Sequence, residues 1–321
     1  MQPLSRRLAL IVAFCMMNAL AMTHASAQMI EEAWSDGGLR GTFARPTTAA
    51  ARGPVVLIIA GSGPTDRNGN GPIVQTDTYS KLAEAFAGAG ISSLRYDKRG
   101  IGESRALVTR EEDIVFSDFV NDAVSAIRSL SAQPDVSSVV VVGHSEGALI
   151  GLLASSMKAE VAGLVLLTAT GRSMRAILQD QLKNGLPPAL ETESQTILEA
   201  LAKGQRVTNV SRELMPLFRP SVQPFMISIL NIDPVIELAK VTKPILIMHA
   251  GRDLQIFPAD FEALRKARPD ARVVEMPNAN HVLKTAPADL AGNRALYQNR
   301  DAPLDADVMR PLIEFVRTVG R

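Results

Sequence analysis

The feature that most constrains this chain is a glycine-flanked serine between a buried strand and a helix. Residues 139–142 are four consecutive valines, residues 143–147 read Gly-His-Ser-Glu-Gly, and small and apolar residues at helical spacing follow. In that context the pattern is typical of a sharp strand-to-helix turn that lifts the serine clear of the sheet. Gly143 and Gly147 lack a Cβ, so strand and helix can approach closely there. We therefore expect Ser145 to be a nucleophile at a helix N-terminus, where backbone N–H groups favour a developing oxyanion.

The first 27 residues have the pattern of a cleavable export signal. Arg6 and Arg7 form a basic region, residues 8–22 are apolar, and residues 25–27 (Ala-Ser-Ala) are a small-residue cleavage signal. The sequence predicts a mature chain that begins at Gln28, exported to the periplasm without a stable membrane anchor. The sequence does not choose between export by the general secretory pathway and by the twin-arginine pathway, because the paired arginines match a twin-arginine signal only in part.

The composition excludes several classes of site. Cys15 is the only cysteine and lies in the predicted signal, so the mature chain has no disulfide framework, thiol nucleophile or cysteine-based metal site. Without Arg6 and Arg7, the 34 basic residues become 32 against 33 acidic ones, a net charge of −1. That balance indicates neither a nucleic-acid nor an anionic-membrane surface. We expect no cofactor, no metal and no nucleic-acid partner, and we make no prediction of the oligomeric state.

Apolar runs alternate with helical patterns along the rest of the chain. Continuous apolar runs predict strands that are covered on both faces, and apolar residues three and four apart predict helices. The expected strands are 54–60, 91–96, 139–142, 161–167, 244–250 and 271–276, preceded by a hairpin within 29–45. The expected helices are 78–89, 114–130, the helix after the serine to about 157, 258–267 and 311–319. This alternation indicates an α/β fold with a mostly parallel, doubly wound sheet.

The alternation stops between residues 170 and 243. Apolar residues at helical spacing are broken there by glycines and prolines, which predicts several short helices inserted after the strand 161–167. Such an insertion can serve packing alone, but a long insertion in a compact domain is typically functional. We expect a helical cap that supplies an apolar, water-excluding pocket over the serine. The predicted organisation is a signal peptide (1–27), a core (28–169 and 244–321) and a cap (170–243).

A serine hydroxyl needs a base, and elimination among four histidines leaves one candidate. His24 lies in the predicted signal, and His144 is expected to point away from Ser145 on the strained turn. His249 ends a buried strand, where a structural histidine is expected. His281 lies in a polar loop after the final strand, and parallel strands present such loops at the ligand-binding edge of the sheet. The sequence therefore predicts His281 as the base.

Asp253 is the predicted partner of that histidine, because it directly follows a buried strand in the sequence Gly-Arg-Asp. The third group of a triad orients the imidazole and stabilises its charged form. The chain order Ser145, Asp253, His281 is the order expected when the nucleophilic serine is the central residue of a Gly-x-Ser-x-Gly turn. Asp260, in a predicted helix, and Asp289, beyond the His281 loop, are the alternatives.

Two backbone N–H groups are needed to stabilise an oxyanion. One is expected from Glu146, the residue after the nucleophile. The other is expected from the loop after the strand 54–60, from Ser62 with Gly63 as the alternative.

The Glu146 side chain raises a separate question, because a carboxylate beside an oxyanion opposes it unless the carboxylate is neutralised. We hypothesise that it pairs with Arg99, Lys98 or Arg67. The alternative is an exposed carboxylate that has no special partner.

Five motifs in this order carry a family resemblance: residues 61–64 (Gly-Ser-Gly-Pro), 96–104 (Tyr-Asp-Lys-Arg-Gly-Ile-Gly-Glu-Ser), 143–147, 251–253 and 280–281 (Asn-His). Over nearly all of the mature sequence the chain resembles the α/β-hydrolase superfamily, and within it a branch of bacterial serine esterases. Ala60 departs from the pattern, because many relatives have a histidine there. The resemblance implies an α/β-hydrolase fold and carboxylic-ester hydrolysis through an acyl-enzyme, acting on a small-molecule ester with an apolar acyl or alcohol part.

Other functions use the same residues. A peptidase or thioesterase would use the same triad, and a non-catalytic binding protein could share the fold. A peptidase that binds a free amino terminus needs an acidic cluster in the cap. The candidates for that cluster are Glu191, Glu193, Glu199 and Glu213.

Overall fold

The structure is a computed structural model, in which residues 29–48, 52–157, 160–183 and 186–320 are described. The predicted signal peptide, residues 1–27, lies outside the described residues. Within the described ranges, no helix is both long enough and apolar enough to cross a membrane.

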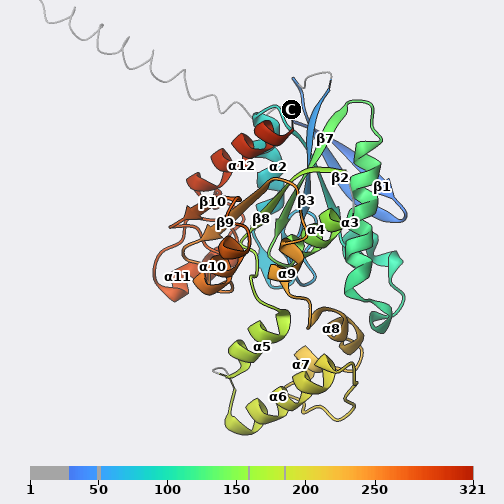
Figure 1. The fold of residues 1–321 in the computed structure, drawn as a ribbon, viewed down its shortest axis with the longest axis vertical. Coiled ribbons are helices and arrows are strands. Elements are labelled where there is room, and N and C mark those ends of the chain that lie inside the picture. Colours follow the sequence, from blue (N-terminus) through green and yellow to red (C-terminus); the bar gives the residue numbers. More distant parts are fainter. Residues whose placement is uncertain (1–28, 49–51, 158–159, 184–185, 321) are drawn as a thin grey trace, which may run out of the picture.

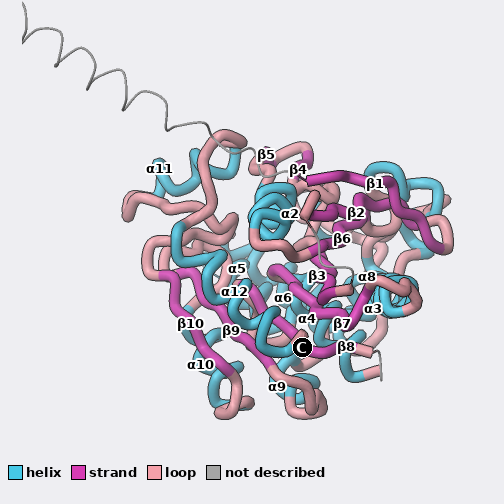
Figure 2. Tube along the Cα trace, turned by 90° about the horizontal axis from the view of Figure 1, so that it is seen from above, coloured by secondary structure: helices cyan, strands magenta, loops and turns pink. Residues whose placement is uncertain are grey.

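An eight-stranded sheet forms the centre of the molecule, in the order β1-β2-β6-β3-β7-β8-β9-β10. Figure 2 shows this order across the sheet, from β10 at one side to β1 at the other. The strands from β6 to β10 pair in parallel, whereas β1 and β2 add an antiparallel hairpin at one edge. The predicted mostly parallel sheet is therefore confirmed. The strands are β1 (Met29–Asp36), β2 (Leu39–Pro46), β3 (Gly53–Ile59), β6 (Ser92–Asp97), β7 (Val136–His144), β8 (Val161–Leu167), β9 (Ile245–Ala250) and β10 (Arg272–Met276).

Helices cover both faces of the sheet. The helices of the core are α2 (Thr78–Gly88), α3 (Phe116–Ser131), α4 (Glu146–Ser156), α10 (Pro258–Ala267), α11 (Leu290–Ala295) and α12 (Ala306–Val319). Helices α2 and α12 pack on one face, and α3, α4 and α10 pack on the other. Along β3, Val55, Leu57 and Ile59 face one layer while Val56 and Ile58 face the other. This two-sided burial is the physical reason that the strands appear in the sequence as unbroken apolar runs.

Some boundaries differ from the sequence prediction. The last helix, α12, begins at Ala306 and not at Pro311, so the predicted start is wrong. The Asp305 side chain caps the helix by accepting a hydrogen bond from the Asp307 backbone N–H at 3.0 Å. The sequence prediction also missed α11 and a short hairpin of β4 (Asn70–Gly71) and β5 (Val74–Gln75). Short 3₁₀ helices follow β6 as η1 (Gly102–Leu107) and η2 (Glu111–Asp113), and η3 (Leu296–Gln298) follows α11.

The chain between β8 and β9 forms short helices, of which α5 to α8 lie beyond one end of the sheet while α9 packs against the core, as Figure 1 shows. They are α5 (Met174–Lys183), α6 (Pro188–Ala202), α7 (Met215–Phe218), α8 (Gln223–Ile229) and α9 (Pro234–Leu238). Leu198, Leu201 and Phe218 form a separate apolar cluster with their neighbours in α5 to α8. Leu238 of α9 instead joins the apolar layer on the sheet. The helical insertion thus has its own small core and is continuous with the main one.

Aromatic contacts attach α8 to α3. The ring of Phe225 meets Phe116 and Phe119 edge to face, with centroid distances of 6.1 and 5.7 Å. The Phe116 backbone N–H donates to Ser228 Oγ at 2.8 Å. Aromatic pairs of this geometry stabilise beyond their buried area. The insertion is therefore fixed over the end of the sheet where the parallel strands finish.

Helix α4 packs closely against the backbone of β3 at Gly147. A Cβ at this position would lie 2.2 Å from the Ile59 carbonyl oxygen and 2.6 Å from that of Ala60. A Cβ at Gly143 would lie 2.3 Å from the Gly147 carbonyl oxygen. Both glycines are therefore required by packing, as the motif predicted.

We predict that Gly147→Ala lowers the free energy of unfolding by about 1–3 kcal/mol or more, because the added methyl must displace the β3 backbone. Urea unfolding followed by circular dichroism measures the change. Gly53→Ala in β3 is the matched control, since a Cβ there meets no atom within 4 Å. We expect the control to stay within about 0.5 kcal/mol of wild type. Equal stability of the two variants would contradict the prediction.

Candidate active site

Ser145 sits on a strained turn between β7 and α4. Its φ of 54° and ψ of −122° are unusual for a residue with a side chain. The backbone N–H of Ser145 donates to the Leu167 carbonyl at 3.0 Å, which holds the turn against β8. Strain of this kind persists only where the surrounding structure enforces it, and it concentrates at functional sites.

The structure brings His281 and Asp253 into direct contact. His281 Nδ1 lies 2.8 Å from Asp253 Oδ2, and the Asp253 side chain is fully buried. Asp253 Oδ1 accepts hydrogen bonds from the backbone N–H groups of Gln255 and Ile256 at 2.7 and 3.0 Å. Burial on its own would raise the pKa of Asp253. The charge and hydrogen bond of His281, together with the two N–H groups, outweigh that effect and hold the pKa below its ordinary value.

His144 links the Ser145 turn to the loop that carries His281. Its Nε2 lies 2.8 Å from the His281 carbonyl oxygen, its Nδ1 lies 2.9 Å from Tyr79 Oη, and the two imidazole rings are 4.8 Å apart. Tyr79 Oη accepts the Gly61 N–H at 2.8 Å, and burial raises the pKa of Tyr79. The tyrosine therefore keeps its one proton and donates it to His144 Nδ1, so His144 Nε2–H donates to His281. His144 thus holds the His281 loop beside the Ser145 turn, and both of its ring nitrogens are hydrogen-bonded.

Burial also fixes the protonation state of His144. Removal from water, followed by repulsion from His281, lowers the pKa of His144 to about 3. A neutral imidazole matches the tautomer that its two hydrogen bonds require.

A chain of amides connects the two loops of the candidate triad. Asn280 Nδ2 donates to Asn293 Oδ1 at 3.1 Å, and Asn293 Nδ2 donates to the Arg252 carbonyl at 2.8 Å. Asn280 and Arg252 directly precede His281 and Asp253. This network fixes the two loops relative to each other. A functional pair of side chains needs such support to keep its geometry.

The alternatives that the sequence left open have other roles in the structure. The Asp260 carboxylate accepts hydrogen bonds from Arg172 and from the backbone of Gly171. Asp289 caps α11 by accepting from the Gly292 N–H at 2.7 Å. His249 stacks on the ring of Phe261, with a centroid distance of 4.9 Å. Neither aspartate contacts His281 among the interactions of the described residues.

The residues predicted to bind an oxyanion lie at the start of α4 and in the loop after β3. Glu146 is the first residue of α4, where backbone N–H groups have no carbonyl partner within the helix. Ser62 and Gly63 lie in the exposed loop after β3, and Gly63 has a φ of 80°. The structure leaves both loop residues as candidates for the second donor.

The Glu146 side chain is buried against Lys98, which confirms one of its three hypothesised partners. Lys98 Nζ lies 2.9 Å from Glu146 Oε1, and both side chains are less than a tenth exposed. Arg99 instead binds Asp122 through two hydrogen bonds, at 2.6 and 2.8 Å. Arg67 binds Asp97 and Glu103. The alternative of an exposed Glu146 without a partner is wrong.

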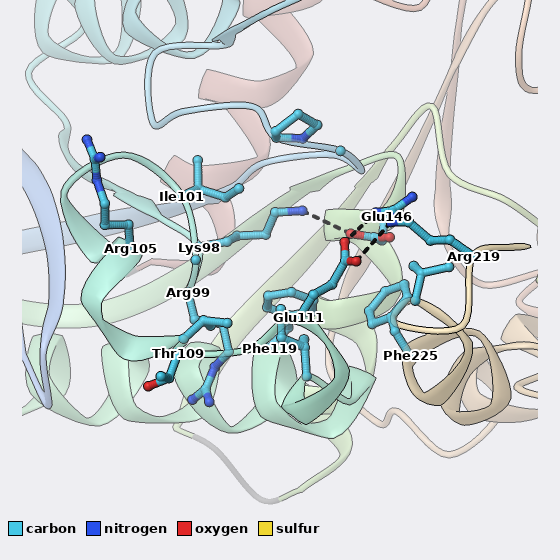
Figure 3. Close-up of a pocket in the computed structure, with 16 residues that line it drawn as sticks. Lys98, Arg99, Ile101, Arg105, Thr109, Glu111, Phe119, Glu146, Arg219 and Phe225 are labelled. Atoms are coloured by element: carbon cyan, nitrogen blue, oxygen red, sulfur yellow. Dashed lines mark hydrogen bonds and ion pairs between the residues drawn. The ribbon is translucent and has the colours of Figure 1, made fainter. Parts of the chain in front are cut away.

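Two cavities meet at the loop after β3. The larger, which we call the Phe225 cavity, has a volume of about 590 Å³ and reaches Glu146; the smaller, the Tyr297 cavity, has about 360 Å³ and reaches His281. Both are lined by Gly63 and Pro64. Figure 3 shows the Phe225 cavity between α3, α8 and the loops after β6. These volumes are in the range of small-molecule sites.

The Phe225 cavity is apolar in its walls and charged at its base and rim. Its apolar lining includes Ile114, Phe119, Val222 and Phe225. Its two carboxylates are already neutralised: Glu111 pairs with Arg219, and Glu146 pairs with Lys98, as Figure 3 shows.

Several of these residues could not be identified from the sequence. Tyr79, Asn293, Phe225 and Tyr297 belong to no recognisable motif, and each reaches the site from a separate helix or 3₁₀ helix. Only the rarity of tyrosine, with three in the chain, could have drawn attention to Tyr79 and Tyr297.

Comparison with known proteins places this geometry in a family. The model of the serine aminopeptidase S33 family matches residues 70–285, about two thirds of the chain. Esterase EstD of Thermotoga maritima is 28% identical over 236 residues, which are 72% of this chain and 54% of EstD. The chain thus spans about half the length of this relative.

Solved structures share the fold at low sequence identity. Est1E from Butyrivibrio proteoclasticus, with ferulic acid bound, superposes with a TM-score of 0.56 and 17% identity, covering 89% of this chain and 96% of Est1E. Proline iminopeptidase from Mycobacterium smegmatis superposes with a TM-score of 0.55 and 15% identity, covering 90% and 98%. An esterase and a peptidase share this fold equally well, so the likeness does not choose between them.

We predict that the stability contributed by His144 depends on pH. Its folded pKa of about 3 lies below the unfolded value near 6.5, so the unfolded state binds the proton more readily. Wild type therefore loses stability as the pH falls from about 6.5 towards 3, and His144→Gln lacks this loss. The difference in unfolding free energy between the two proteins should narrow from pH 7 to pH 4.5, measured by urea unfolding. A difference independent of pH would contradict the prediction.

Proposed function

Because the chain belongs to the serine aminopeptidase S33 family of α/β-hydrolases, we propose that it is a serine hydrolase that cleaves carboxylic esters. The observation that carries the proposal is the contact of His281 with a fully buried Asp253, tied by His144 to the strained Ser145 turn. In this reading Ser145 is the nucleophile, His281 the base, and Asp253 the group that orients it.

The proposed reaction has two steps. Ser145 Oγ attacks the ester carbonyl while His281 takes its proton, and the N–H groups of Glu146 and Ser62 stabilise the tetrahedral oxyanion. His281 then protonates the departing alcohol, which leaves an acyl-enzyme on Ser145. Water attacks this ester with His281 as the base, and the acid is released.

The two cavities support an orientation for the substrate. The departing alcohol must lie beside His281, and the Tyr297 cavity is lined by that residue. The acyl part then occupies the Phe225 cavity, whose aromatic and aliphatic walls suit an apolar chain. In this proposal the insertion between residues 170 and 243 is a cap, since it supplies Val222 and Phe225 to the acyl site.

The charges of the site favour an ester substrate over a peptide substrate with a free amino terminus. A free amino terminus needs an unpaired carboxylate, yet both acidic residues of the Phe225 cavity are paired with cations. Glu191, Glu193, Glu199 and Glu213 do not line either cavity among the described residues. Glu193 is occupied by Ser211, to which it is hydrogen-bonded twice. A thioester would use the same groups, and substrate competition distinguishes it.

Export to the periplasm is part of the proposal. It is supported by the basic, apolar and small-residue pattern of residues 6–27.

We predict that a fluorophosphonate probe labels wild type and not Ser145→Ala, because phosphonylation requires an activated serine. Asp253→Asn should lower kcat for p-nitrophenyl esters by about 10⁴-fold, since it loses the group that sets the histidine tautomer. Intact-mass measurement and ester hydrolysis are the readouts, with aminoacyl anilides and acyl thioesters as competing substrates. Labelling at another serine, or faster turnover of anilides than of esters, would overturn the proposal.

We also predict that Val222→Trp discriminates against long acyl chains, because the indole fills the Phe225 cavity. The ratio of kcat/KM for octanoate over acetate esters of one alcohol should fall about tenfold or more. Val74→Trp in the Tyr297 cavity is the matched control and should instead disfavour bulky alcohols at a fixed acyl group. If Val222→Trp instead disfavoured bulky alcohols and Val74→Trp disfavoured long acyl chains, the assignment of the acyl and alcohol parts to the two cavities would be wrong.

A further inference from the structure

The buried ammonium of Lys98 contacts both sides of the proposed oxyanion hole. Lys98 directly follows β6, and its side chain is 3% exposed. Its Nζ donates to the Gly61 carbonyl at 2.6 Å and to Glu146 Oε1 at 2.9 Å. The ring of Phe119 lies 5.3 Å from the same nitrogen, within the range of a cation–π contact. Figure 3 shows Lys98 extended towards Glu146.

The bond to Gly61 determines the direction of the next N–H group. The Gly61 carbonyl and the Ser62 N–H belong to one peptide unit, which is planar and trans. In such a unit the two groups point in opposite directions, so a fixed carbonyl also fixes the N–H. Tyr79 Oη holds the N–H of Gly61 itself at 2.8 Å. The backbone of Gly61 is therefore held on both sides, although Ser62 and Gly63 beyond it are exposed.

Glu146 completes the connection. Its backbone N–H is the other proposed oxyanion donor, and its carboxylate accepts the Lys98 ammonium. One ion pair thus joins the residue that supplies the first N–H to the peptide unit that supplies the second. Lys98 also neutralises a carboxylate that would otherwise oppose the oxyanion.

We propose that Lys98 and Glu146 are positioning residues that hold the Ser62 N–H in the oxyanion hole. The inference rests on the proposed serine hydrolase function and assigns the second donor to Ser62 over Gly63. Neither side chain touches the substrate carbonyl in this proposal, and both act through the Gly61–Ser62 peptide unit. The opposing explanation is that Lys98 serves only to neutralise Glu146.

A variant cycle separates the two explanations. Lys98→Met releases the Gly61 carbonyl and leaves Glu146 unpaired, and Glu146→Gln keeps an oxygen that can accept from Lys98. The double variant Lys98→Met/Glu146→Gln removes the charge but still leaves Gly61 without its donor. If charge is the only issue, the double variant regains the activity of Glu146→Gln. If Lys98 positions the peptide unit, the double variant stays as impaired as Lys98→Met.

We expect kcat for p-nitrophenyl butyrate to fall about 10- to 100-fold in Lys98→Met and in the double variant. KM should stay within about twofold of wild type. The fall in kcat is smaller than the loss of about 10²- to 10³-fold that follows complete removal of an oxyanion donor, because the donor is misplaced and not removed. The Ki of a trifluoromethyl ketone, which forms a serine-bound oxyanion, should rise by the factor by which kcat/KM falls. Glu146→Gln should stay within about fivefold of wild type, because its amide oxygen still accepts from Lys98.

The control is Arg45→Met, which removes the Arg45 ion pairs with Asp135 and Glu32; Arg45 lies in β2 near the start of β6, at the other end of these strands from Lys98. It should keep wild-type kcat and Ki even where its melting temperature falls. Replacing a buried ion pair with uncharged residues of similar volume is often neutral for stability. The double variant therefore keeps the test valid if Lys98→Met alone fails to fold.

Recovery of activity in the double variant would overturn the positioning role, as would a rise in KM at unchanged kcat. A Ki for the ketone that stays at the wild-type value while kcat falls would also overturn it. Failure of the proposed function looks different, because wild type itself would then show no fluorophosphonate adduct at Ser145 and no ester hydrolysis.

Discussion

The contact of α4 with the backbone of β3 at Gly147 is the constraint on which the site depends. Because the helix begins immediately after β7 and lies against β3, Ser145 must adopt a φ of 54°. The turn sends consecutive side chains in different directions. His144 reaches Tyr79 and the His281 backbone, and Glu146 reaches Lys98. A single close approach between two backbones thus organises the proposed nucleophile, the loop that carries His281 and the buried ion pair.

The sequence was sufficient wherever the determining pattern is local. Continuous apolar runs predicted the buried strands, and the Gly-His-Ser-Glu-Gly turn could be read with its flanking strand and helix. His281 and Asp253, which the structure places in contact, could be selected as candidates because few histidines exist and because polar loops after parallel strands meet at one edge. Local patterns could not choose among Lys98, Arg99 and Arg67 as the partner of Glu146, since each is a cation near the same turn. That choice depends on Asp122 and Asp97, which occupy the two arginines.

The roles of His144 and Tyr79 were missed for a related reason. Their partners lie 65 and 137 residues away in the chain, and nothing in the neighbouring sequence records these contacts. The predicted start of the last helix at Pro311 is wrong because Asp305 caps α12 earlier and Pro311 lies inside it. The sequence predicted the insertion as short helices that cap the serine and supply an apolar pocket, but not which of its residues line a cavity. Its contribution of Phe225 to a cavity follows from the contact of that ring with Phe116 and Phe119 in α3.

The Lys98–Glu146 pair is poorly explained by stability alone. Removing two charges from water costs several kcal/mol per ion, and apolar residues of similar volume often stabilise such a position as well or better. The pair has a geometric consequence that apolar residues cannot reproduce, because only a donor can hold the Gly61 carbonyl. Lys98 needs a buried acceptor to sit there, and the side chain of Glu146, the residue whose own N–H is the other proposed oxyanion donor, supplies it. The cost of burying the pair is therefore best understood as the cost of holding two N–H groups from separate loops in one orientation.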